Sequence, residues 1–302
     1  MRPDTPLTIY ELRATSGEAR TLLERSDLGA LVGPQLEGFH WEADFAFLFC
    51  TAGAELGPLL EAVPGLELRM EHHLRYDEWQ DGAGARPIVM GPLAVLPLEG
   101  GGIPDPPAGI PPPGGLAPLY IDPGLAFGYG GHPTTRACLG FLLRIMDPRN
   151  PSPPRSFLDL GSGTGVLALA ALRLGAAAAL GVDYSHLAVR CAAANARLNG
   201  LADRASFEYG LAGERASWPA EVLMANVPLA VHLDLLGRDA YSGRRYLILS
   251  GLLPREADEF KALLGRALEY RELDNHRDDR WSSWLLETPS QGKRPSPGPA
   301  CG

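Results

Sequence analysis

The sequence predicts an α/β protein in which a small α+β domain precedes a doubly wound, mostly parallel sheet of seven strands. Two observations predict the large sheet. Apolar strand-like runs alternate with helical patterns between residues 156 and 268, and one run leads through closely spaced glycines directly into a helix. Such alternation is typical of parallel sheets with right-handed crossovers. Shorter strand and helix signals before residue 80 predict the small domain.

The small domain is expected over residues 1–80. Its elements are expected at Leu7–Leu12 (strand), Ser16–Ser26 (helix), Phe39–Cys50 (a single alternating strand), Ala54–Val63 (helix) and Leu66–Tyr76 (strand). This order fits a β-α-β-β-α-β unit of the ferredoxin-like type, or a shortened version of it.

Residues 81–117 are expected to form a linker. Their centre, Glu99–Gly115, is so rich in proline and glycine that it cannot bury a core, and such runs favour extended geometry. The segment contains one plausible strand, Leu93–Leu98, which could still join a neighbouring sheet. A proline-rich ligand for a recognition domain is the alternative interpretation.

The third domain is expected over residues 118–288, and a tail rich in Pro, Gly and Ser at 289–302 is expected to be disordered. Strands are expected at Ser156–Leu160, Ala178–Asp183, Ser206–Tyr209, Val222–Asn226 and Tyr246–Ser250. Helices are expected at Gly165–Leu174, Ser185–Leu198, Leu229–Ala240 and Pro254–Leu268. Two final strands, Glu269–Asp274 and Ser283–Glu287, have no helix between them, which predicts an antiparallel pair at the sheet edge.

The composition limits the class of partner. The net charge is −9, whereas proteins that grip nucleic acid through its phosphates usually carry a basic field. We therefore expect a basic protein substrate and no direct nucleic-acid partner.

The four cysteines lie outside metal-ligand spacing, and no stretch has the pattern of a signal peptide or a membrane span. A cytoplasmic monomer without a metal is expected.

A glycine-rich turn follows the first strand of the large domain, within Phe157–Leu167. Gly161, Gly163 and Gly165 would let a nucleoside ligand approach the backbone, because any Cβ would obstruct it. The dinucleotide fingerprint is G-x-G-x-x-G, whereas the spacing here is G-x-G-x-G, with Asp159 two residues before the first glycine. The pattern favours S-adenosylmethionine as cofactor, and a purely structural glycine turn is the alternative.

Two polar residues end the neighbouring strands. Asp183 lies 24 residues after Asp159, close to the spacing of roughly 20 at which a ribose-binding acid occurs in nucleoside folds. Alternatively, Asp183 could cap the following helix, although Ser185 could also take that role. Asn226 ends the fourth strand, where open α/β sheets bind their ligands. Asn226 would therefore lie beside the reactive methyl group, unless it only forms a turn.

Upstream of the glycine turn, residues 121–136 read Ile-Asp-Pro-Gly-Leu-Ala-Phe-Gly-Tyr-Gly-Gly-His-Pro-Thr-Thr-Arg. This segment resembles the D-P-G-x-A-F-G-T-G-x-H-x-T-T signature of the PrmA family, the methyltransferases that modify lysines of ribosomal protein L11. The glycine turn, Asp183, Asn226 and the run Leu249–Leu253 resemble the family's later blocks in order and spacing. The resemblance covers roughly Pro118 to Glu287.

The resemblance implies a Rossmann-like methyltransferase sheet, S-adenosylmethionine as cofactor and a large-subunit ribosomal protein as substrate. The strand and helix order of residues 1–80 is similar to the family's small substrate-binding domain. By the same resemblance, cofactor-binding positions fall on Phe127, Thr134, Thr135, Asp159, Gly161, Asp183 and Asn226, and the active-site loop contains Phe127 and His132.

The sequence departs from the family pattern on the substrate side. Tyr129 stands where the family usually has Thr, and Val227-Pro228 replaces a more typical Ile-Leu pair. The alternatives are therefore lysines of another protein, such as the electron-transfer flavoprotein β-subunit, a small molecule, RNA, or a catalytically silent scaffold. We expect in-line transfer to a lysine or α-amino nitrogen, with positioning by Asn226 favoured over general-base work by His132. A capping or loop-bracing histidine is an equal alternative.

Overall fold

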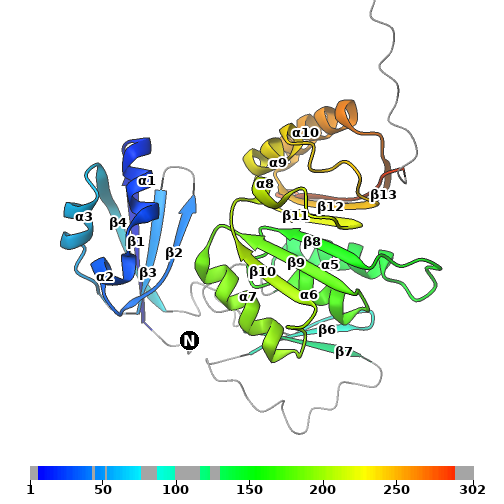
Figure 1. The fold of residues 1–302 in the computed structure, drawn as a ribbon, viewed down its shortest axis with the longest axis horizontal. Coiled ribbons are helices and arrows are strands. Elements are labelled where there is room, and N and C mark those ends of the chain that lie inside the picture. Colours follow the sequence, from blue (N-terminus) through cyan, green and yellow to red (C-terminus); the bar gives the residue numbers. More distant parts are fainter. Residues whose placement is uncertain are drawn as a thin grey trace, which may run out of the picture. The chain divides into compact units, whose positions relative to one another are not determined.

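The computed structural model describes residues 6–42, 45–51, 53–75, 87–98, 116–122 and 130–289. The chain forms two compact units (Figure 1). The first contains the described residues between 6 and 75 together with 97–98 and 122, and the second contains those at 87–96, 116–121 and 130–289. Most of the proline-rich segment, and the tail from residue 290 for which disorder was expected, lie outside the described residues.

The first unit consists of β1 (Pro6–Ala14), α1 (Gly17–Arg25), α2 (Leu28–Val32), β2 (Leu36–Glu42), β3 (Phe45–Cys50), α3 (Gly57–Ala62) and β4 (Leu66–Arg75). The sheet has the order β2-β3-β1-β4 with antiparallel neighbours, as expected for a ferredoxin-like unit. The predicted single strand Phe39–Cys50 is wrong, because β2 and β3 form a hairpin there. The alternation of aromatic residues continues through both strands, so the pattern alone does not show the break. Helix α2 was not predicted.

The large sheet lies in the second unit. Its strands are β8 (Ser156–Leu160), β9 (Ala178–Asp183), β10 (Ala205–Tyr209), β11 (Val222–Asn226), β12 (Tyr246–Leu252), β13 (Arg271–Arg277) and β14 (Ser282–Glu287). The order is β10-β9-β8-β11-β12-β14-β13. The five strands from β10 to β12 are parallel to one another, and β14 is antiparallel to both β12 and β13. The predicted doubly wound, mostly parallel sheet is confirmed.

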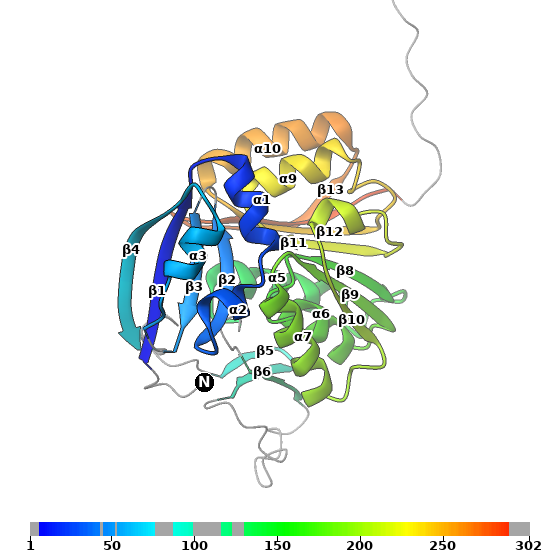
Figure 2. The same cartoon turned by 60° about the vertical axis from the view of Figure 1, so that its left-hand side comes forward.

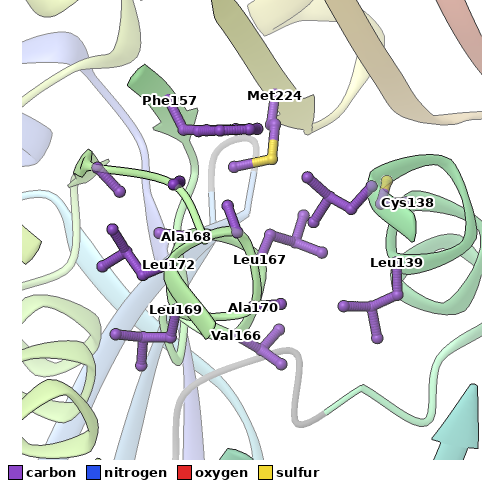
Figure 3. Packing of buried hydrophobic residues seen from close by; sticks show 14 of the residues in the cluster. Cys138, Leu139, Phe157, Val166, Leu167, Ala168, Leu169, Ala170, Leu172 and Met224 are labelled. Carbon is purple, nitrogen blue, oxygen red and sulfur yellow. The ribbon is translucent and has the colours of Figure 1, made fainter. Parts of the chain in front are cut away.

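Helices cover both faces of the large sheet. They are α5 (Pro133–Ile145), α6 (Val166–Arg173), α7 (His186–Leu198), α8 (Ala212–Arg215), α9 (Leu229–Gly237) and α10 (Pro254–Ala267). Figures 1 and 2 show α5, α6 and α7 on one face and α8, α9 and α10 on the other. Helix α6 is buried along nearly its whole length, because Phe157 and Met224 of the sheet and Cys138 and Leu139 of α5 surround it (Figure 3). None of the helices in the described part of the chain is long and apolar enough to cross a membrane.

A second, three-stranded sheet belongs to the same unit. It has the order β5 (Ile88–Met90), β6 (Leu93–Pro97) and β7 (Ala117–Ile121). Leu93, Val95 and Leu119 are buried in the core that also contains α5 and α6. Part of the region expected as linker is therefore sheet. The strand expected at Leu93–Leu98 is confirmed as β6. Strand β5 has only three residues, too few to give a periodic signal, so composition placed it in the linker.

One side chain attaches this small sheet to α7. The Asn199 side chain follows the last turn of α7, where its Oδ1 accepts a hydrogen bond from Tyr120 N (2.9 Å). Its Nδ2 donates to Tyr120 O (2.6 Å) and Asn195 O (2.8 Å). The amide therefore pairs with β7 as a neighbouring strand would, and all its polar atoms are satisfied.

Candidate active site

The sheet register brings three of the residues selected from the sequence together. Leu160 at the end of β8 pairs with Val182 of β9 on one side and with Ala225 of β11 on the other. Gly161 follows Leu160, Asp183 follows Val182 and Asn226 follows Ala225. These three residues therefore lie side by side at the carboxyl ends of adjacent strands. The chain continues from β8 to β9 in one direction and returns to β11 in the other. Such a switch point is where open α/β sheets bind ligands.

The glycine turn adopts a backbone that other residues disfavour. The φ angles of Gly161, Gly163 and Gly165 are +77°, +52° and +78°. A Cβ on Gly165 would lie 2.8 Å from the Phe207 ring and 2.9 Å from the Ala192 side chain. The third glycine is therefore required by packing behind the turn, in addition to its φ angle. Nothing in the sequence pattern pointed to Phe207.

Asp183 is held at the turn by backbone donors. Its Oδ2 accepts from Gly163 N and its Oδ1 from Ser185 N, both at 2.9 Å. A carboxylate has about four lone-pair positions, so each oxygen can still accept a hydrogen bond from a ligand. Burial raises the pKa of Asp183, and the backbone donors oppose that rise. Ser185 caps α7 by accepting from Ala188 N, so Asp183 is not needed as the cap.

A second carboxyl group is buried beneath the turn. Asp159 is 1% exposed, and burial together with the charge of Asp183 raises its pKa to about 7. Its Oδ2 accepts from Ala168 N at 3.2 Å. Its Oδ1, the Thr135 hydroxyl and the Ser162 hydroxyl are buried without a hydrogen-bond partner among the residues that the structure describes. Two of these orphaned atoms, on Asp159 and Ser162, belong to β8 and the turn that follows it, and buried unpaired polar atoms are typical of a site built for a polar ligand.

Asn226 is connected by hydrogen bonds to the start of α5. Its Nδ2 lies 3.1 Å from Thr134 Oγ1, which lies 2.7 Å from His132 Nδ1. His132 is the N-cap of α5, because its Nδ1 accepts from Thr134 N at 3.4 Å. The edge of the Trp281 ring packs on the imidazole, with 5.2 Å between the centroids. Phe127 and Tyr129, selected from the sequence, lie outside the described residues.

The loop after Asn226 is fixed from behind by β12 and α9. Val227 N and His232 Nε2 both bond to Ser250 O, at 3.1 Å and 2.9 Å. Burial lowers the pKa of His232 to about 4, so the ring is neutral and its Nδ1 accepts from the Tyr241 hydroxyl at 2.8 Å. Gly251 has φ +87°, and a Cβ there would lie 2.6 Å from Val227 O. His232 was not identified from the sequence, because its partners Tyr241 and Ser250 lie outside α9 and only the fold brings them beside the ring.

Comparisons with known proteins identify the same family as the motifs. The family model described as Ribosomal protein L11 methyltransferase (PrmA) matches residues 115–287. A ribosomal protein L11 methyltransferase of Paraburkholderia xenovorans (strain LB400) is 32% identical over 255 residues, covering 83% of this chain and 75% of its own. One from Shewanella sp. (strain ANA-3) is 31% identical over 293 residues, covering 92% and 94%.

A further match, to the enzyme of Chromobacterium violaceum, is 42% identical over 154 residues but covers only 50% of this chain and 48% of that protein. The crystal structure of a ribosomal protein L11 methylase from Lactobacillus delbrueckii subsp. bulgaricus superposes with a TM-score of 0.54. It is 24% identical and covers 68% of this chain and 99% of that chain, which supports the fold.

The matched family model spans more than half of the chain, and full-length relatives exceed 30% identity, so the chain belongs to the ribosomal protein L11 methyltransferase (PrmA) family.

Proposed function

We propose that the protein is an S-adenosylmethionine-dependent methyltransferase that methylates amines of ribosomal protein L11, lysine side chains foremost. The main support for the proposal is the pairing of β8 with β9 and β11. This pairing places Gly161 between Asp183 and Asn226 at the carboxyl ends of the three strands. Family membership supports the substrate. A cytoplasmic location follows from that substrate, because the large ribosomal subunit is assembled there.

The residues present fit the cofactor. Asp183 would hold the ribose hydroxyls with its remaining lone pairs, and the glycine turn would let the nucleoside approach the backbone. Asp159 Oδ1 and Thr135 Oγ1, both buried without a partner in the described part of the chain, would satisfy the polar amino-acid end. When bound, S-adenosylmethionine supplies an electrophilic methyl group, which passes to the amine as the S–C bond breaks and the C–N bond forms.

The protein's task at the amine is to bind it neutral and oriented. A free lysine has a pKa near 10.4 and carries no lone pair while it is protonated. A site that excludes water lowers the pKa of an amine, and an oriented amine about 3–3.5 Å from its target reacts as in an intramolecular step. Asn226 Oδ1 would accept an N–H of the neutral amine and leave its lone pair directed at the methyl group. The general-base role that His132 could have played is not required by this scheme.

We further propose that the first unit, within residues 1–80, recruits the protein substrate. It has its own core, built around Leu12, Leu48 and Leu59, and therefore offers a recognition surface that does not depend on the cofactor site. The catalytic domain would then comprise residues 118–288 together with the strands β5 and β6 that join its core.

The test combines cofactor binding with methyl transfer. Isothermal titration with S-adenosylmethionine should show binding, and radiolabelled methyl groups should appear on purified ribosomal protein L11. Asp183→Ala should weaken cofactor binding and abolish transfer, and Asn226→Ala should abolish transfer with a smaller loss of binding. Asp203→Ala, an exposed position in the turn before β10, is the matched control.

Each contrary result has a definite meaning. Binding without any transfer, on L11 or in a lysate, would make the protein a silent scaffold. A different labelled protein in the lysate would overturn the substrate and leave the activity. Unchanged turnover in Asp183→Ala or Asn226→Ala would refute the role of that residue.

A further inference from the structure

The hydrogen bonds between His132, Thr134 and Asn226 have a direction. The Thr134 backbone N–H points at His132 Nδ1, so a lone pair and not a hydrogen occupies that nitrogen. The Thr134 hydroxyl, 2.7 Å from the same nitrogen, must then donate its single hydrogen to it. With its hydrogen committed, Thr134 Oγ1 can only accept from Asn226, at 3.1 Å.

This direction determines which way the Asn226 amide faces. The two ends of an asparagine amide have nearly the same shape, and only their hydrogen bonds distinguish oxygen from nitrogen. Because Thr134 Oγ1 acts as acceptor, it selects the Nδ2 end. Oδ1 is therefore turned away from Thr134. Thr134 and His132 are fully or partly buried, and Trp281 packs on the imidazole, so the arrangement is held from several sides.

We propose that His132 is a positioning residue that acts through Thr134 to keep the carbonyl oxygen of Asn226 facing the substrate amine. The proposal rests on the proposed methyl-transfer function. In the reversed orientation, an Asn226 N–H would donate to the amine lone pair and block the electrons that must form the new bond. The Nδ1 acceptor of His132 is thus the feature that matters, and proton abstraction by its imidazole is not required.

The proposal separates the roles of two adjacent threonines. Thr135 Oγ1 is buried without a partner among the described residues and is available to the cofactor, whereas Thr134 Oγ1 is engaged with Asn226 and His132. Loss of the Thr134 hydroxyl should therefore reduce kcat more than cofactor affinity. Loss of the Thr135 hydroxyl should have the opposite effect.

The decisive experiment is a double-mutant cycle between His132→Leu and Thr134→Val, with kcat measured on ribosomal protein L11. Each single variant should lower kcat by about 10- to 100-fold, the scale of a misoriented catalytic group. The double variant should lose no more than the worse single variant, because both changes break the same chain of hydrogen bonds. The dissociation constant for S-adenosylhomocysteine should change by less than about threefold in His132→Leu.

Conservative variants test the atom that is responsible. His132→Asn places an oxygen acceptor near the Nδ1 position and preserves a good helix cap, whereas His132→Gln places its amide near the Nε2 position. His132→Asn should recover about tenfold of the kcat that His132→Leu loses, and His132→Gln should not. Thr134→Ser should likewise recover activity relative to Thr134→Val.

The outcomes that overturn the proposal differ from those that overturn the proposed function. Parent protein that does not methylate L11 refutes the function itself. With an active parent, multiplicative losses in the double variant show that the two residues act independently. Equal inactivity of His132→Asn and His132→Gln indicates an imidazole base. A lowered Tm in His132→Leu with parental kcat below that Tm leaves His132 as a helix cap only.

Discussion

Asp159 and Asp183 are two carboxyl groups buried in one site. Because burial disfavours their ionised forms, the unfolding free energy of the protein should depend on pH. Because the pKa of Asp159 is raised to about 7, the folded protein retains a proton that the unfolded chain releases near pH 4. The unfolding free energy should therefore fall as the pH rises from about 4 to about 7. Asp183, whose pKa is raised as well, contributes in the same direction.

The variant Asp159→Asn removes one of these two ionisations. Without cofactor, its unfolding free energy should fall less steeply between about pH 4 and about pH 7 than that of the parent, by about 1.4 kcal/mol for each pH unit in that window. Urea unfolding at the two pH values measures the difference, with the exposed Asp203→Asn as control. A parental slope in Asp159→Asn would show that this carboxyl group ionises freely in the folded protein.

Individual site residues were predictable where strand order alone determines their position. Asp183 and Asn226 each end a strand, so the sequence was enough to expect them at one edge. The engagement of Asn226 with Thr134 was not predictable, because the two residues are 92 positions apart and meet only through packing of α5. Phe207 and His232 were missed because their contacts, with Gly165 and with Ser250, form only when separate elements pack together.

The loop after β11 depends on close contact with β12 at Gly251. Gly251→Ala should reduce the unfolding free energy by about 2–4 kcal/mol, because a left-handed backbone and a clash with the Val227 carbonyl add together. Turnover should fall too, since the displaced loop begins directly after Asn226. Gly175→Ala is the matched control: its φ is +111°, but no atom lies within 4 Å of the added Cβ. Equal losses in both variants would mean that Val227 moves aside at no cost.

Among the elements, long apolar runs were predicted better than short ones. The bounds of β8, β9 and β11 agree with the sequence prediction, because each is a mostly apolar run that ends at, or directly before, a glycine or a polar residue. Strand β6 confirms the strand expected at Leu93–Leu98, whereas β5 was assigned to the linker because three residues do not establish a period of two. The hairpin of β2 and β3 was joined into one strand, since the same alternation continues through both.

The whole molecule has two units with separate cores, so calorimetry should resolve two unfolding transitions. S-adenosylhomocysteine should raise the Tm of the second unit's transition only. At a hundredfold excess over its Kd, it should add about 2.7 kcal/mol to the unfolding free energy of that unit. Leu48→Ala changes a fully buried position of the first unit. It should lower the unfolding free energy of that unit by about 2–5 kcal/mol and leave the transition of the second unit unchanged. A single transition that shifts as a whole with either change would contradict independent unfolding.

The bond between Asn199 and β7 has a consequence for chemical ageing. Asn199 is followed by Gly200, the dipeptide in which an asparagine side chain most readily cyclises and loses its amide. Deamidation would replace the Nδ2 donor by a carboxylate oxygen facing the carbonyls of Tyr120 and Asn195, where two attractions become two repulsions. The same hydrogen bonds hold the side-chain carbonyl carbon away from the position at which the Gly200 backbone nitrogen would attack it and expel the amide as ammonia. Stored protein would therefore deamidate at this position only after β7 has come away from α7, and the resulting aspartate would prevent its return.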